Sequence, residues 1–153
     1  MYHSETMRVS LLEILDQAIA AVGACAGNIQ IYNATTGALE IVVHRGFPPD
    51  VAELWRVVHT TASTVCARGW RGRHRVVIQN LAKDKPFAPY LATAERLGIK
   101  AVQSTPLPGV AHPIGMMSTH FPVTRKPSPA EERLLDDCAQ RAARVISELA
   151  AAA

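Results

Sequence analysis

The fold of this chain is decided by two neighbouring stretches, AVQSTPLPG (residues 101–109) and GMMSTHF (residues 115–121). Each stretch holds a Ser-Thr pair among apolar residues, within strands predicted over residues 100–107 and 114–121. Side chains of a strand alternate between two faces, so each stretch places polar and apolar groups on both faces. The pattern predicts two paired inner strands of a sheet that is covered on both faces.

Three further strands are predicted before this pair, over residues 28–32, 39–44 and 76–79. The first two are separated by NATTG (residues 33–37), whose residue types are typical of a tight turn, so they form a hairpin. The third is rich in β-branched residues, which favour strands.

Helices are predicted at both ends of the chain and between the strands. Apolar residues at helical spacing indicate a first helix over residues 7–22. Short helices are expected over residues 48–57, from a Ser63 cap to about Gly69, and over residues 89–97. The last helix, over residues 128–149, begins with a capping box and a proline, SPAE (residues 128–131). Its small residues would let another helix approach closely: Ala139, Ala142 and Ala143.

This order of elements predicts an α+β sandwich. The terminal helices would cover one face of an antiparallel sheet, and the middle helices and loops would cover the other. A chain of 153 residues with 48% hydrophobic residues is long enough for one such domain, with one core.

Composition limits the function classes. No apolar run is long enough to span a membrane, and the start MYHSETMRVS lacks the order of a signal peptide, so a cytoplasmic protein without a membrane partner is expected. Three widely spaced cysteines fit neither a disulfide framework nor a zinc site, and no metal site is predicted. The run ARGWRGRHR (residues 67–75) could contact an anion, but it is read as a solvated loop, and nucleic acid is not expected as a partner.

Seven motifs, in order, resemble those of a GAF domain of bacterial signalling proteins, as found with histidine kinases. They are GNIQIYN (27–33), TG (36–37), HRGF (44–47), STVCA (63–67), FAPY (87–90), QSTPL (103–107) and GMMSTHF (115–121). The resemblance covers residues 11–149. It therefore implies a single domain over residues 1–153 with its core at about 11–149, and residues 1–6 and 150–153 are expected to fray.

The resemblance implies five or six antiparallel strands, with the N- and C-terminal helices on one face and a ligand pocket on the other. It also implies a sensory role in signal transduction, as in two-component systems, with a histidine kinase or another signalling protein as the partner in trans. Family members often form dimers through their terminal helices, so a homodimer is expected.

The family's ligands vary, and the sequence leaves the cofactor unknown. The Cys-His pair that attaches a bilin is absent from this sequence, because Cys66 is followed by Ala67. The Asn-Lys-Phe-Asp-Glu signature of cyclic-nucleotide binders is absent too, and the clustered cysteines of the methionine-sulfoxide reductases of this fold are not found. The connection PGVAHP (residues 108–113) is also shorter than the last hairpin of most family members.

The candidate ligand-binding residues are polar residues on the strands and a cysteine on a middle helix: Gln30, Tyr32, His44, Cys66, Gln103, Ser104, Ser118 and His120. Pockets are mostly apolar with a few convergent polar groups, which fits this set. Strand phase leaves open whether Gln103 or Ser104 faces the pocket. A structural network of strand-to-strand hydrogen bonds explains the same residues equally well.

Two alternatives to small-molecule sensing remain at this point. One is a redox or hydrolytic enzyme that uses Cys66 and His120, although no catalytic constellation is identifiable and no enzyme is predicted. The other is a ligand-free dimerisation module, in which Trp55, Trp70 or Tyr90 would fill the pocket.

Overall fold

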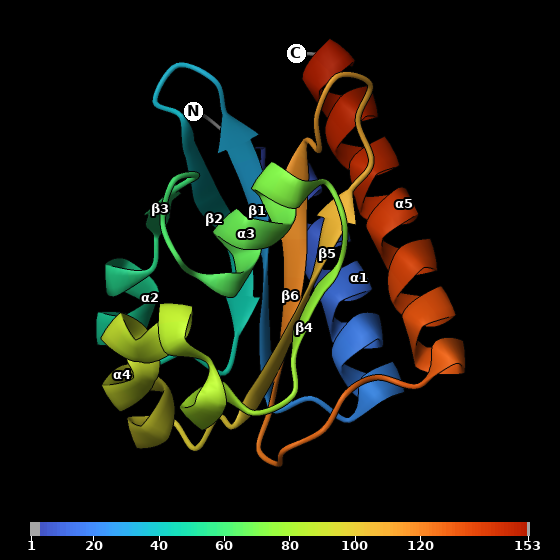
Figure 1. Ribbon diagram of the computed structural model, residues 1–153. Coiled ribbons are helices and arrows are strands. Elements are labelled where there is room, and N and C mark those ends of the chain that lie inside the picture. Colours follow the sequence, from blue (N-terminus) through green and yellow to red (C-terminus); the bar gives the residue numbers. More distant parts are fainter. Residues whose placement is uncertain (1–3, 153) are drawn as a thin grey trace.

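The computed structural model describes residues 4–152 of the chain, and within them six strands form one antiparallel sheet (Figure 1). The strand order is β3-β2-β1-β6-β5-β4. The strands are β1 (Ala26–Asn33), β2 (Ala38–Arg45), β3 (Val57–His59), β4 (Val76–Ile78), β5 (Ala101–Leu107) and β6 (Gly115–Phe121). The two stretches with Ser-Thr pairs, residues 101–107 and 115–121, therefore lie side by side as β5 and β6, inside the sheet.

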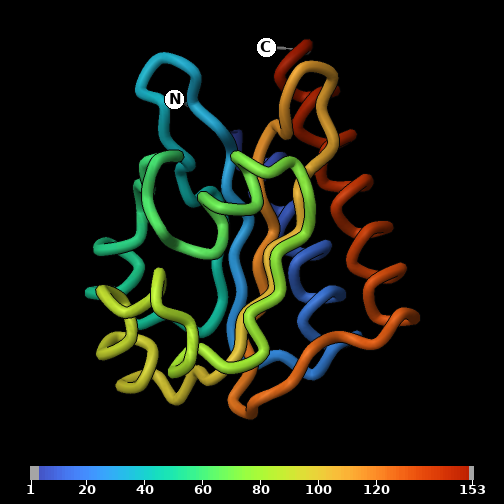
Figure 2. The backbone as a smooth tube through the Cα atoms, in the orientation of Figure 1, coloured from blue at the N-terminus to red at the C-terminus, as the bar shows by residue number. Residues whose placement is uncertain are grey.

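Helices cover both faces of the sheet. The long helices α1 (Glu5–Val22) and α5 (Pro129–Ala152) lie side by side on one face. The short helices α2 (Pro49–Leu54), α3 (Val65–Gly72) and α4 (Leu91–Arg96) lie on the other, with the 3-10 helices η1 (Leu81–Lys83) and η2 (Lys85–Tyr90). Figure 2 shows the chain between β2 and β5 looping over this second face. In the described part of the chain, no helix has both the length and the apolarity needed to cross a bilayer.

The main core lies between the sheet and the two long helices. Alternate strand residues such as Ile29, Met117 and Phe121 point to this side and are buried against α1 and α5. The three alanines predicted to permit close helix packing, Ala139, Ala142 and Ala143, are buried in this same core. The helix that approaches them is α1 of the same chain.

Local signals explain where the helices begin. Ser128 Oγ accepts a hydrogen bond from the backbone N–H of Glu131 (3.1 Å), and a Glu131 carboxylate oxygen accepts one from the backbone N–H of Ser128 (2.9 Å). This is the predicted capping box. At α3, Gly69 allows close packing on the sheet, because a Cβ there would stand 2.6 Å from Met116 Cε of β6.

The predicted fold class is confirmed, and the differences are local. The short strand β3 was missed, because VAELWRV (residues 51–57) reads as a continuous helix, whereas Trp55 ends α2 and Val57–His59 then pairs with β2. The cap of α3 is Thr64 rather than Ser63, and the helix continues beyond Gly69 to Gly72. Residues 85–90, partly predicted as α-helix, are 3-10. Residues 1–3 and 153 lie outside the described part, and residues 5–6 and 150–152 belong to α1 and α5.

Candidate functional site

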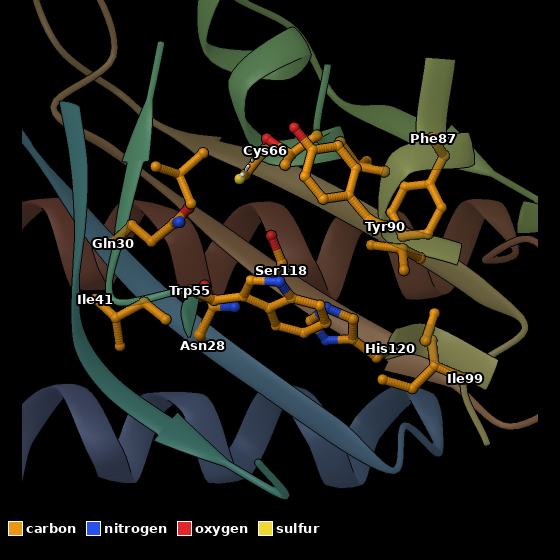
Figure 3. A pocket seen from close by; sticks show the side chains of 15 residues that line it. Asn28, Gln30, Ile41, Trp55, Cys66, Phe87, Tyr90, Ile99, Ser118 and His120 are labelled. Carbon is orange, nitrogen blue, oxygen red and sulfur yellow. Dashed lines mark hydrogen bonds between the residues drawn. The ribbon is translucent and has the colours of Figure 1, made fainter. Parts of the chain in front are cut away.

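A cavity lies between the second face of the sheet and the short helices (Figure 3). The space open to the centre of a water molecule is about 50 Å³, enough for on the order of four waters. Its fifteen lining residues are Asn28, Gln30, Ile41, Trp55, Val58, Thr64, Val65, Cys66, Phe87, Tyr90, Ala94, Ile99, Val102, Ser118 and His120.

The floor of the cavity is built by the two central strands. Asn28 and Gln30 alternate along β1, and Ser118 and His120 alternate along β6, so all four side chains point to the same side of the sheet. Asn28 lies directly opposite Ser118 in the β1–β6 pairing. The period of the strands thus gathers four polar side chains from two segments far apart in the sequence.

Aromatic side chains close the cavity from the sides. The ring of Trp55, which follows α2, is nearly parallel to the imidazole of His120, with 6.3 Å between ring centroids and 13° between planes. The ring of Phe47 packs edge-on against the rings of His120 and Trp55, with ring centroids 5.3 Å and 5.2 Å apart, respectively. Phe87 and Tyr90, both in η2, contact each other with centroids 5.6 Å apart. The cavity is therefore bounded mainly by aromatic and aliphatic surface.

Two ion pairs connect the short helices that cover the cavity. Arg68 of α3 binds Asp84 with two hydrogen bonds of 3.2 and 2.8 Å, and Asp84 also caps η2 by accepting from the Phe87 backbone N–H. At the surface, Arg96 at the end of α4 donates to Asp50 in the first turn of α2 over 2.8 Å. The first pair is largely buried, whereas the second is exposed.

The described lining of the cavity contains no Asp, Glu, Lys or Arg. Burial lowers the pKa of His120 to about 4, so its imidazole is neutral near pH 7. Burial also raises the pKa of the Cys66 thiol, and hydrogen bonds with the Thr64 and Gln30 side chains only partly oppose this effect. The site is therefore an uncharged one at neutral pH.

Three buried polar atoms of the lining residues have no hydrogen-bond partner within the described protein: Asn28 Oδ1, Gln30 Oε1 and His120 Nδ1. Each side chain belongs to a residue that is at most 7% exposed. Buried polar groups are almost always satisfied by protein, water or ligand. These atoms therefore identify a place where a further molecule would be stabilised.

Four of the eight predicted site residues line the cavity: Gln30, Cys66, Ser118 and His120. Ser104 does not, because α3 packs on this part of β5 and the Ser104 hydroxyl is used in a 2.6 Å hydrogen bond with Ser118. Tyr32 lies farther along β1, where its ring packs on Trp70 of α3 with centroids 4.3 Å apart. His44 stacks on Phe47 near the end of β2 rather than entering the cavity.

Gln103 is on the opposite face of the sheet, where it takes part in a buried hydrogen-bond network. Its amide donates to Thr119 Oγ1 over 3.0 Å and accepts from the Thr105 hydroxyl over 2.6 Å. Arg75 in turn donates to Thr105 Oγ1 over 3.3 Å and to the backbone carbonyl of Glu132 in α5 over 3.0 Å. Gln103 was predicted to line the pocket, but its side chain points to the other face of the sheet. The hydrogen-bond network of Gln103 joins the sheet to α5.

Sequence reasoning missed Asn28 and Phe87 as lining residues. The two-residue period of β1 could have found Asn28, because it shares a face with Gln30. Trp55 and Tyr90, considered only as groups that could fill the pocket, form part of its wall. Trp70 lies elsewhere, and its indole N–H donates to the Pro113 carbonyl over 2.9 Å.

Comparison of the whole fold with solved structures gives many strong matches. The GAF domain/HD domain protein from Geobacter sulfurreducens superposes with a TM-score of 0.77 at 15% identity, over 93% of this chain and 92% of that one. The chain has the GAF fold.

Two other solved structures illustrate the range of proteins with a similar architecture. A domain of a protein described as a two-component sensor histidine kinase from Sinorhizobium meliloti 1021 has a TM-score of 0.74 at 15% identity, over 96% and 93% of the chains. Type II free methionine-R-sulfoxide reductase from Thermoplasma acidophilum has a TM-score of 0.76 at 13% identity, over 94% of each chain. No protein-family model and no curated protein matches this sequence.

Proposed function

We propose that this chain is a regulatory sensing domain that binds a small molecule in the cavity and relays its presence to a signalling partner. The observation that supports it best is the mainly apolar cavity with unpartnered polar atoms from Asn28, Gln30 and His120. A structural network would have used these atoms within the protein. The histidine-kinase and GAF/HD proteins among the similar folds are consistent with a signalling role.

The relay would run through β5 and β6, which carry different groups on their two faces. Ser118 and His120 point into the cavity, while Thr119 between them begins the chain of hydrogen bonds through Gln103 to Arg75 and α5. A ligand that moves β6 would thus act on contacts with α5 as well. Such a ligand shifts a population only by its difference in affinity for the two arrangements.

The proposed partner is a histidine kinase or another signalling protein, together with a second copy of this chain. The dimer would use the outer surfaces of α1 and α5, where Val9 and Leu134 are each 49% exposed. The alanine stripe cannot serve as the seam, because its residues are already buried within one chain.

A reductase function is less well supported by the site, although free methionine-R-sulfoxide reductases are among the similar folds. A nucleophilic cysteine needs a lowered pKa, and burial raises the pKa of Cys66. A disulfide relay also needs a second cysteine nearby. Cys138, however, is in the core on the opposite face of the sheet.

The test of sensing is a search for a bound molecule. The purified protein is examined by native mass spectrometry, and its thermal melting is then measured with a panel of neutral and charged metabolites. We expect at least one compound to raise the melting temperature of the wild-type protein. The same compound should not raise the melting temperature of Ser118→Phe, a variant whose cavity is filled. If neither the spectrum nor the panel gives a binder, the sensing proposal is rejected.

A further inference from the structure

The polar atoms of the cavity define what they can bind. Asn28 Oδ1 and Gln30 Oε1 are amide oxygens, which accept hydrogen bonds and cannot donate them. The neutral imidazole of His120 offers Nδ1 as one further donor or acceptor. An occupant that satisfies all of these atoms must donate at least one N–H or O–H toward β1.

The cavity also lacks the groups that a charged molecule needs. A buried charge is stable only when it is paired, and the described lining residues offer no ionised side chain. The amide oxygens would repel an anion such as a phosphate or carboxylate. A free amino acid would bring two charges, and a cyclic nucleotide one, into the same unpaired surroundings.

The size of the cavity and the chemistry of its walls narrow the class of ligand further. Space of about 50 Å³ for water centres suits a molecule of about one ring, well below a nucleotide or a tetrapyrrole. Trp55, Phe87 and Tyr90 supply aromatic faces and edges, against which a flat ring packs well (Figure 3).

We infer that the cavity takes an uncharged, single-ring aromatic molecule that donates hydrogen bonds from an amide or amine group to Asn28 and Gln30. This inference rests on the proposed sensing function and names its ligand class. At the surface, α2 and α4 beside the cavity are linked by the exposed Asp50–Arg96 pair.

The test uses three probes with one ring and different polar groups: benzamide, benzoate and methyl benzoate. Binding to the wild-type protein is measured by saturation-transfer NMR and by shifts of the Asn28 and Gln30 side-chain amide signals. We expect benzamide to bind, methyl benzoate to bind about tenfold more weakly because it has no N–H, and benzoate not to bind measurably. Equal or tighter binding of benzoate would overturn the inference, as would absence of benzamide binding.

Two glutamine variants provide the matched comparison. Gln30→Met removes the cavity acceptor at similar volume, and we expect it to weaken benzamide binding about tenfold. Gln103→Met makes the same chemical change on the opposite face and should leave binding within about twofold under conditions where it is folded. Equal effects of both variants would show that benzamide does not contact Gln30.

Failure of this inference can be told apart from failure of the sensing proposal. If benzamide does not bind but a charged metabolite of the panel does, and Ser118→Phe abolishes that binding, the ligand class is wrong and the sensing function stands. If the panel and all three probes fail, both are wrong.

Discussion

Gln30 and Gln103 are two buried glutamines of one sheet, 2% and 0% exposed, on opposite faces. Gln103 is bonded on both sides of its amide, to Thr119 and Thr105. The Gln30 oxygen has no partner in the described protein. The same residue type thus stabilises the fold at one position and leaves a binding group available at the other.

Gln103→Met should therefore lower the free energy of unfolding by about 2–3 kcal/mol, since two buried hydrogen bonds are lost and two hydroxyls lose a partner. Gln30→Met should stay within about 1 kcal/mol of the wild type, because removal of the unpartnered oxygen offsets the loss of the hydrogen bond between the Gln30 side chain and Cys66. Urea unfolding of both variants measures the difference. If Gln30→Met were the more damaging change, the Gln30 amide would have a structural role.

The protonation of His120 predicts how stability changes with pH. The pKa of His120 is about 4 in the folded state and about 6.5 in the unfolded chain, so the unfolded state binds the extra proton first. Stability is therefore fully present above about pH 6.5 and is lost as the pH falls toward 4. We expect a loss on the order of 2 kcal/mol between pH 7.5 and pH 5.

His120→Phe is the control for this pH effect. It should give a much flatter dependence over the same interval, measured by urea unfolding at each pH. Carboxylates such as Asp16 and Glu131, whose pKa values are lowered by hydrogen bonds from arginines, lose their stabilising charge only at lower pH. An unchanged slope in His120→Phe would mean that another group titrates there.

At the scale of elements, Arg75 joins three parts of the molecule. Arg75 directly precedes β4 in the chain. Its side chain donates to Thr105 of β5 and binds Glu132 and Asp136 of α5. Its side chain is 16% exposed, so these contacts are only partly screened by water. Arg45 offers a contrast, because it pairs β2 with Asp16 of α1 at a position that is 51% exposed.

Arg75→Met should lower the free energy of unfolding by about 1–3 kcal/mol and speed hydrogen exchange in the first turns of α5. Arg45→Met should cost less than about 1 kcal/mol, as exposed ion pairs do. Chemical unfolding and exchange mass spectrometry check both. Similar small effects from the two variants would argue against a coupling role for Arg75.

The sequence predicted the long elements better than the short ones, for physical reasons. α1, α5 and the four long strands have enough residues for their periodicity to be read, and their order is sufficient for the α+β class. The three-residue strand β3 and the 3-10 turns depend on partners elsewhere in the chain.

The sequence predicted the residues that line the cavity only where they lie on long strands with a readable alternation. Strand alternation placed Ser118 and His120 on one face together, but only the pairing of β5 with β6 decides that Gln103 faces α5. Trp55 and Phe87 enter through helix packing, which leaves no local pattern in the sequence.

At the scale of the whole molecule, the proposed dimer can be tested through exposed apolar residues of the terminal helices. Val9 and Leu134, near the starts of α1 and α5, are large apolar side chains at the surface. The two helices are antiparallel, with Gln17 beside Arg141, so Val9 and Leu134 lie toward opposite ends of the helix pair. A two-fold dimer can pair Val9 of one copy with Leu134 of the other, and the reverse. Because both residues are half exposed, they can be changed with little effect on the fold.

The double variant Val9→Lys/Leu134→Lys should convert the proposed dimer to a monomer in sedimentation equilibrium. Its melting temperature should be close to that of the wild-type protein at a concentration low enough for the dimer to dissociate. Val110→Lys, at a fully exposed position in the β5–β6 connection, is the control and should leave the assembly unchanged. A wild-type protein that sediments as a monomer at its highest soluble concentration would contradict the dimer.

The sheet ends on both sides in strands of only three residues, β3 and β4. An exposed sheet edge is a template on which another chain can add a strand, and short edges offer few backbone groups for that addition. Beside β4, the next backbone carbonyl, Gln79, already accepts from the N–H of Arg125 over 3.2 Å. The two edges therefore give little opportunity for copies of the domain to join sheet to sheet into fibrils.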